Sequence, residues 1–166
     1  MSDDSTDSAW KIHSALVDWT GKVDTKASFA LTLEAAILSA IVLLTRPQQP
    51  ISQIASPLGL VVFWLGCALL GGAALAAVSV VIPRTRANQT AQEWPENYVY
   101  FGHLRHWNPD DLTQHLRASD SDILPVLSRQ LVNMSKIAWI KHRRVQLSLI
   151  LAVAGVFLTA VASLSG

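Results

Sequence analysis

The sequence is poor in charged residues and nearly free of cysteine. Asp, Glu, Lys and Arg make up 15% of the chain and hydrophobic residues 51%, whereas charged residues make up about a quarter of an average soluble domain. The single cysteine, Cys67, lies inside an apolar run, which excludes an intrachain disulfide and favours a packing role. The net charge of +1 gives no basis for binding a nucleic acid polymer.

Sequence motifs for catalysis and metal binding are also missing. The chain has no phosphate-binding P-loop, no nucleophile elbow, no HExxH pair and no set of Cys and His residues at metal-ligand spacing. His103 and His106 lie three positions apart, but no third ligand accompanies them. We therefore expect a protein that is not an enzyme and that holds neither a cofactor nor a metal.

What the sequence does have is three long apolar runs, at residues 27–45, 58–82 and 145–164. The second run contains no charged residue, and as a helix it would rise roughly 37 Å, which exceeds the roughly 30 Å of a hydrocarbon core. A chain of 166 residues cannot bury three such helices in a soluble core. The sequence therefore predicts an all-α membrane protein with three transmembrane helices.

Lysine and arginine are distributed unevenly around these runs. Arg46 lies between the first two runs, and the other twelve lie in residues 1–26 and 83–144. Because cytoplasmic segments carry an excess of Lys and Arg, the N-terminus is predicted to be cytoplasmic and the C-terminus external. The predicted segments are a cytosolic N-terminal helix (1–26), TM1 (27–45), an external loop (46–57), TM2 (58–82), a cytosolic helical region (83–144) and TM3 (145–164).

Helical periodicity extends beyond two of the apolar runs. Apolar residues recur at steps of three and four in residues 10–27 and 123–141. These stripes predict helices from about residue 8 to 45 and from about 121 to 164. Two of the three transmembrane helices are therefore expected to extend into a small cytosolic helical bundle.

Two short sequences predict where cytosolic helices begin. Asp120 or Ser121 is a suitable N-cap for the last long helix, with Pro125 tolerated in its first turn. Asn108 followed by Pro109 and two acidic residues predicts the start of a further short helix, because acids are favourable at the positive end of a helix dipole.

Glu34 is the ionisable residue of the first apolar run. Charged groups at membrane depth usually face a bundle interior or water, so Glu34 is either an ion-sensing or switching residue or one that pairs locally near the interface. Small residues recur at every fourth position in the other two runs and allow close helix packing, within one chain or between protomers. The candidate residues for membrane switching and packing are Glu34, Ala68, Gly72, Ala76 and Gly155.

Aromatic and basic residues gather in residues 94–107. Stacking rings beside cations suit a nucleobase and its phosphate. The alternative is that the rings form the core of the small bundle or lie at the membrane interface. The cluster consists of Trp94, Tyr98, Tyr100, Phe101 and Trp107, interleaved with His103, Arg105 and His106.

Three segments resemble, in order and spacing, the Pycsar transmembrane effector family. They are Trp19–Ser28 with its Asp24-Thr25-Lys26-Ala27-Ser28 step, Tyr100–Leu104, and Arg129–Arg144. The resemblance implies an effector of bacterial antiphage defence in the inner (plasma) membrane. Such an effector responds to cyclic UMP or cyclic CMP, made by a separate cyclase, by impairing that membrane, which causes growth arrest or death.

A cytosolic messenger of this kind needs cations for its phosphodiester and a ring for its base. The candidate nucleotide-binding residues are Lys26, Tyr100, Arg105, Trp107 and Lys141. The expected partners are the lipid bilayer, the cyclic pyrimidine nucleotide and further copies of the chain, because three helices are too few to enclose a pore. The alternatives are a ligand-free scaffold protein of the membrane and a subunit of an oligomeric ion channel.

Overall fold

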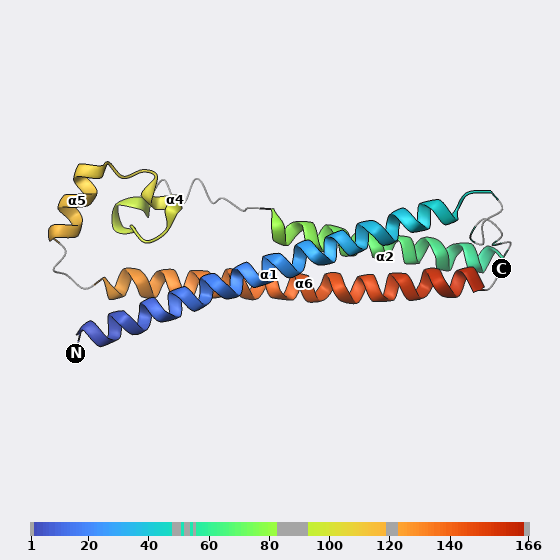
Figure 1. Ribbon diagram of the computed structural model, residues 1–166, viewed down its shortest axis with the longest axis horizontal. Helices are drawn as coiled ribbons and strands as arrows, with labels where there is room; N and C mark the ends of the chain where they lie inside the picture. Colours follow the sequence, from blue (N-terminus) through green and yellow to red (C-terminus); the bar gives the residue numbers. More distant parts are fainter. Residues whose placement is uncertain are drawn as a thin grey trace. The chain divides into compact units, whose positions relative to one another are not determined.

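The computed structural model describes residues 2–47, 51, 54, 56–82, 93–118 and 123–164. Its regular elements in these ranges are all helical (Figure 1), which confirms the predicted all-α class. In chain order they are α1 (Ser2–Leu44), α2 (Pro57–Val81), the 3-10 helix η2 (Trp94–Glu96), α4 (Phe101–Leu104), α5 (Pro109–Ala118) and α6 (Leu124–Leu164).

Three of these helices, α1, α2 and α6, are long and apolar enough to cross a membrane. The predicted apolar runs lie in these helices, apart from Thr45 and Ile82, which directly follow α1 and α2. The chain is therefore a multi-pass membrane protein. The helix α1 begins at Ser2, six residues before the start that periodicity predicted, and α6 begins at Leu124, three residues after its predicted start. The proposed caps Asp120 and Ser121 lie outside the described residues, and the exact membrane boundaries stay predictions.

The starts of two helices follow from local chemistry. At α5 the Asn108 Oδ1 accepts a hydrogen bond from the backbone N–H of Asp110 at 3.0 Å, which confirms the predicted helix start at Pro109. At α2 the Ser56 hydroxyl oxygen accepts from the N–H of Gly59 at 3.4 Å, and Pro57 occupies the first turn. Both pairs satisfy N–H groups that have no partner within the helix.

The chain divides into two compact units. Unit 1 comprises Met1–Gly21 and Pro83–Trp139, and unit 2 comprises Lys22–Ile82 and Ile140–Gly166. The helices α1 and α6 contribute residues to both units. Unit 2 contains all of α2 and the apolar runs of α1 and α6, whereas unit 1 contains η2, α4 and α5.

The core of unit 2 follows a heptad pattern. Buried residues of α2 alternate at steps of four and three, which is the 3.5-residue period of left-handed helix packing. They are Gly59, Phe63, Gly66, Leu70, Ala73, Ala77 and Val80. The buried residues of α6 in unit 2 fall on the same kind of seam, and they are Val145, Ser148, Gly155, Thr159 and Ala162.

All three long helices contribute to the packing of unit 2. One buried cluster joins Ala27 of α1, Val80 of α2 and Val145 of α6, and a second includes Phe63 of α2 and Ala162 of α6. Small residues predominate on the α6 seam. Their side chains bury little apolar surface, and close contact between the helix backbones stabilises the packing instead.

Candidate functional site

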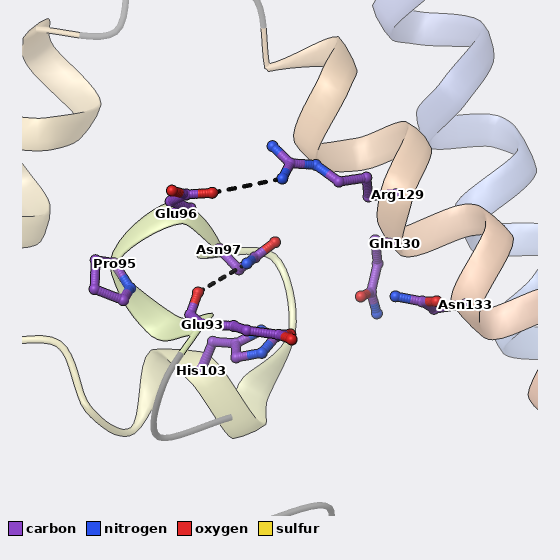
Figure 2. Close-up of a pocket in the computed structure, with 8 residues that line it drawn as sticks. All are labelled: Glu93, Pro95, Glu96, Asn97, His103, Arg129, Gln130 and Asn133. Carbon is purple, nitrogen blue, oxygen red and sulfur yellow. Dashed lines mark hydrogen bonds and ion pairs between the residues drawn. The ribbon is translucent and has the colours of Figure 1, made fainter. Parts of the chain in front are cut away.

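A polar pocket lies within unit 1, between the segment that begins at Glu93 and the first turns of α6 (Figure 2). Its volume is about 410 Å³, which is within the range of small-molecule binding sites. It is lined by Glu93, Pro95, Glu96, Asn97, His103, Arg129, Gln130 and Asn133.

An ion pair crosses the pocket at one side. Arg129 Nη1 lies 3.6 Å from Glu96 Oε2, and both side chains are mostly exposed. This separation is longer than a good hydrogen bond, and exposed ion pairs contribute between about 0 and 1 kcal/mol. The guanidinium is therefore held weakly and can exchange its partner. On the wall that carries Glu96, Asn97 Nδ2 donates a hydrogen bond of 2.8 Å to the Glu93 carbonyl and so stabilises the short helix η2 between these two residues.

Two side-chain amides extend from α6 into the pocket. Gln130 and Asn133 lie three positions apart and so share one helix face. Figure 2 shows both on the wall that faces Glu93 and His103. Within the described part of the chain, neither amide has a hydrogen-bond partner, so both are available to a ligand.

His103 contributes an imidazole on the other wall. Its Nδ1 atom is buried and lacks a hydrogen-bond partner among the described residues. Burial lowers the pKa of His103; the Glu93 carboxylate opposes this shift and His106 adds to it. A neutral ring offers one donor and one acceptor nitrogen, so the pocket combines amide, imidazole, carboxylate and guanidinium groups.

The neighbouring aromatic residues form a half-buried cluster of ring contacts. The rings of Trp94 and Trp107 meet edge to face at 5.1 Å, and His115 of α5 lies 5.1 Å from both Trp107 and Tyr98. The Trp107 indole N–H donates to the carbonyls of Trp94 and Asn97, at 3.1 and 3.3 Å. These contacts give the Trp107 ring protein partners within unit 1.

The five predicted nucleotide-binding residues are divided between the two units. Tyr100, Arg105 and Trp107 belong to unit 1, and Lys26 and Lys141 to unit 2. Tyr100 is half-buried, with its ring 4.4 Å from Phe101. Arg105 is exposed, and its Nε donates to His106 Nε2 at 3.1 Å. None of the five lines the pocket of Figure 2.

The cations of unit 2 include two with internal partners. Lys141 Nζ donates to both carboxylate oxygens of Asp24, at 2.6 and 2.8 Å, which joins α6 to α1. Arg144 Nη1 donates to the Ser79 carbonyl at 3.3 Å, near the C-terminal end of α2, where a cation is favourable. Lys26 is exposed. Asp24 and Lys141 therefore form a clamp between two long helices.

Glu34 is buried in unit 2, on the apolar part of α1, and has a hydrogen-bond partner on α6. It is 1% exposed, and its Oε1 accepts a hydrogen bond of 2.6 Å from the Ser148 hydroxyl of α6. Its Oε2 is buried without a hydrogen-bond partner among the described residues. Glu34 therefore pairs with Ser148 in the interior of unit 2, and its assignment as a switching residue stays a prediction.

The backbones of α2 and α6 approach closely at two glycines. A Cβ atom on Gly155 would lie 2.8 Å from the Gly66 carbonyl oxygen, and one on Gly66 would lie 2.9 Å from the Gly155 oxygen. Gly72, by contrast, has only the Leu151 side chain nearby, at an ordinary 3.7 Å. Ala68 is exposed and Ala76 half-buried, so these three candidate residues lie off the tightest contact.

Sequence reasoning missed Gly66, Ser148 and the pocket residues of α6. The heptad steps of α2 carry the signal for Gly66, because Gly59, Gly66 and Ala73 recur every seven residues on one seam. Two of the segments that resemble the Pycsar family, Tyr100–Leu104 and Arg129–Arg144, contribute residues to the pocket, but no sequence pattern joins its two walls.

These features define an all-α, multi-pass membrane protein with a polar pocket in a separate unit. A family model described as the Pycsar effector protein domain matches residues 8–166. The chain therefore belongs to the Pycsar effector family, a family of antiphage defence effectors. No curated protein and no solved structure matches it.

Proposed function

We propose that this protein is a non-enzymatic effector that responds to cyclic UMP or cyclic CMP by impairing the bacterial inner membrane. The consequence is growth arrest or death of the infected cell. The observation that carries the proposal is the family match over residues 8–166, together with three helices able to span a membrane. In this proposal the N-terminus and unit 1 face the cytoplasm, where the messenger is made, and the C-terminus faces outward.

The helix arrangement supports coupling between messenger and membrane. Because α1 and α6 contribute residues to both units, a ligand that changes their packing in unit 1 acts on helices that also form unit 2. The Asp24–Lys141 clamp and the Glu34–Ser148 pair hold these same two helices together. A ligand can shift the equilibrium between a resting and an active packing of these helices only if it binds one packing more tightly than the other. Nucleotide binding and membrane damage must therefore be linked.

A single chain does not suffice for a pore in this proposal. Three spanning helices pack against one another through the seams of unit 2, and such a bundle encloses no path for ions. The active form is therefore a homo-oligomer in the lipid bilayer. No cofactor takes part, since the ligand acts by binding alone.

Ligand binding is tested with the full-length protein in detergent. Cyclic UMP or cyclic CMP should raise its melting temperature more than cyclic AMP does. At a concentration of 100 times the dissociation constant, the added stability would be about 2.7 kcal/mol, which a thermal melt resolves. Equal shifts with all three nucleotides, or none with any, would contradict the proposal and favour a ligand-free scaffold protein.

A further inference from the structure

We propose that the polar pocket of unit 1 is the binding site for the cyclic pyrimidine nucleotide, with Arg129 on the phosphodiester and Gln130 and Asn133 on the base. This inference rests on the proposed function and assigns it a site. It differs from the residues predicted from the sequence, because it uses side chains that line one cavity in a single unit.

Arg129 is suited to the phosphodiester. It carries the permanent positive charge of the pocket lining, and a guanidinium binds two phosphate oxygens in a planar fork. Its present partner, Glu96, lies 3.6 Å away and is exposed. Replacing this carboxylate by a phosphodiester therefore costs little interaction free energy. The Glu96 carboxylate therefore competes with the ligand for Arg129.

Gln130 and Asn133 are suited to the base. A side-chain amide presents one acceptor oxygen and two N–H donors. Against uracil the oxygen accepts from N3–H while the nitrogen donates to a carbonyl, and against cytosine the oxygen accepts from the exocyclic amine. Two amides on one face of α6, both without a partner in the described part of the chain, supply this complementarity.

Glu93 and His103 suit the ribose end. A carboxylate accepts a hydrogen bond from a sugar hydroxyl, and His103 adds a buried Nδ1 that still lacks a partner in the described structure. Figure 2 shows Glu93 and His103 at one end of the pocket, and at the other end the Arg129–Glu96 ion pair, which spans the two walls. The negative Glu93 thus favours an orientation in which the phosphodiester lies at Arg129.

The experiment measures dissociation constants of cyclic UMP and cyclic CMP by calorimetry on the full-length protein in detergent. Arg129→Gln should weaken binding by at least about tenfold, as expected for losing a hydrogen bond to a charged group. Asn133→Asp preserves the side-chain shape but adds a negative charge, and should also weaken binding. Glu96→Gln removes the competing carboxylate and should tighten binding, a gain that misfolding cannot produce.

Two matched variants control for general charge effects. Arg117→Gln and Gln114→Glu alter exposed residues of α5 that do not line the pocket, and both should bind like wild type. If wild type binds but Glu96→Gln and Asn133→Asp leave the affinity unchanged, the pocket assignment is wrong and the proposed function stands. If wild type binds neither nucleotide, the proposed function itself fails. Should Arg129→Gln not fold, the other two variants decide.

Discussion

A single added methyl group at Gly155 should destabilise the membrane bundle. The Cβ of Gly155→Ala would lie 2.7 Å from Leu70 Cγ, 2.8 Å from the Gly66 carbonyl oxygen and 3.0 Å from the Leu70 nitrogen. Carbon atoms in contact normally lie about 3.5–4.0 Å apart. Two of the three neighbours are backbone atoms, so α2 and α6 must separate by several tenths of an ångström along their seam.

Overpacking of this kind typically costs about 1–3 kcal/mol. The matched control is Gly72→Ala, whose Cβ would meet only Leu151 at 3.7 Å. It should be neutral, or stabilising by up to about 1 kcal/mol because alanine favours the helix. The unfolding free energies of both variants are measured by reversible unfolding of the purified protein in mixed micelles with increasing dodecyl sulfate. Equal unfolding free energies for Gly155→Ala and Gly72→Ala would refute the close glycine contact.

Three further predictions concern the buried pair, the pocket histidine and the topology. Ser148→Ala removes the hydrogen-bond donor to Glu34 and should destabilise the packed helices of unit 2 by about 0.6–1.7 kcal/mol. Glu34→Gln can still accept from Ser148 and should destabilise them less. The reverse order of the two unfolding free energies in micelles would contradict the pairing. Because the pKa of His103 is lowered in the folded protein, folding loses stability as pH falls below about 6.5, the ordinary histidine pKa. Between pH 7.5 and 5.5, the melting temperature of His103→Gln should therefore fall by less than that of wild type. An identical fall in both proteins would argue against burial of the ring. A reporter active only in the periplasm should be active when fused after Gly166 and silent when inserted near Asn88, and the opposite result would reverse the proposed orientation.

Much of the fold could be predicted because helices depend on local sequence. The uninterrupted apolar run that begins at Leu58 becomes α2, which starts one residue earlier at Pro57. The start of α5 depends on a hydrogen bond between two residues that are close in sequence, Asn108 and Asp110, so it too could be predicted. The extension of α1 and α6 beyond the apolar runs followed from their three- and four-residue stripes.

The packing residues were harder to predict because a ridge of small residues does not reveal its partner. The Ala68–Gly72–Ala76 ridge and the Gly66 seam are both compatible with close approach, and only the alternating heptad steps of α2 distinguish the inward face. Likewise, the sequence marks Glu34 as unusual but does not say that Ser148, on a helix far along the chain, is its partner.

The sequence drew attention to segments that contain His103 and Arg129, but not to the pocket that they line. Arg129 and Glu96 are brought together only by the fold of unit 1. The aromatic residues near them were prominent in the sequence, but Trp107 directs its indole N–H to backbone carbonyls of its own segment. The prominent rings form a half-buried cluster, whereas each polar side chain that lines the cavity is common in sequences of this kind and does not stand out by itself.

The most direct test of the account is leakage from proteoliposomes that contain the purified protein. Dye-loaded vesicles should remain sealed in buffer and with cyclic AMP, and should release dye when cyclic UMP or cyclic CMP is added. The release should follow the same concentration dependence as nucleotide binding, since the two are thermodynamically linked. Vesicles that stay sealed while the nucleotide is bound, or that leak equally with and without it, would contradict the claim that messenger binding impairs the membrane.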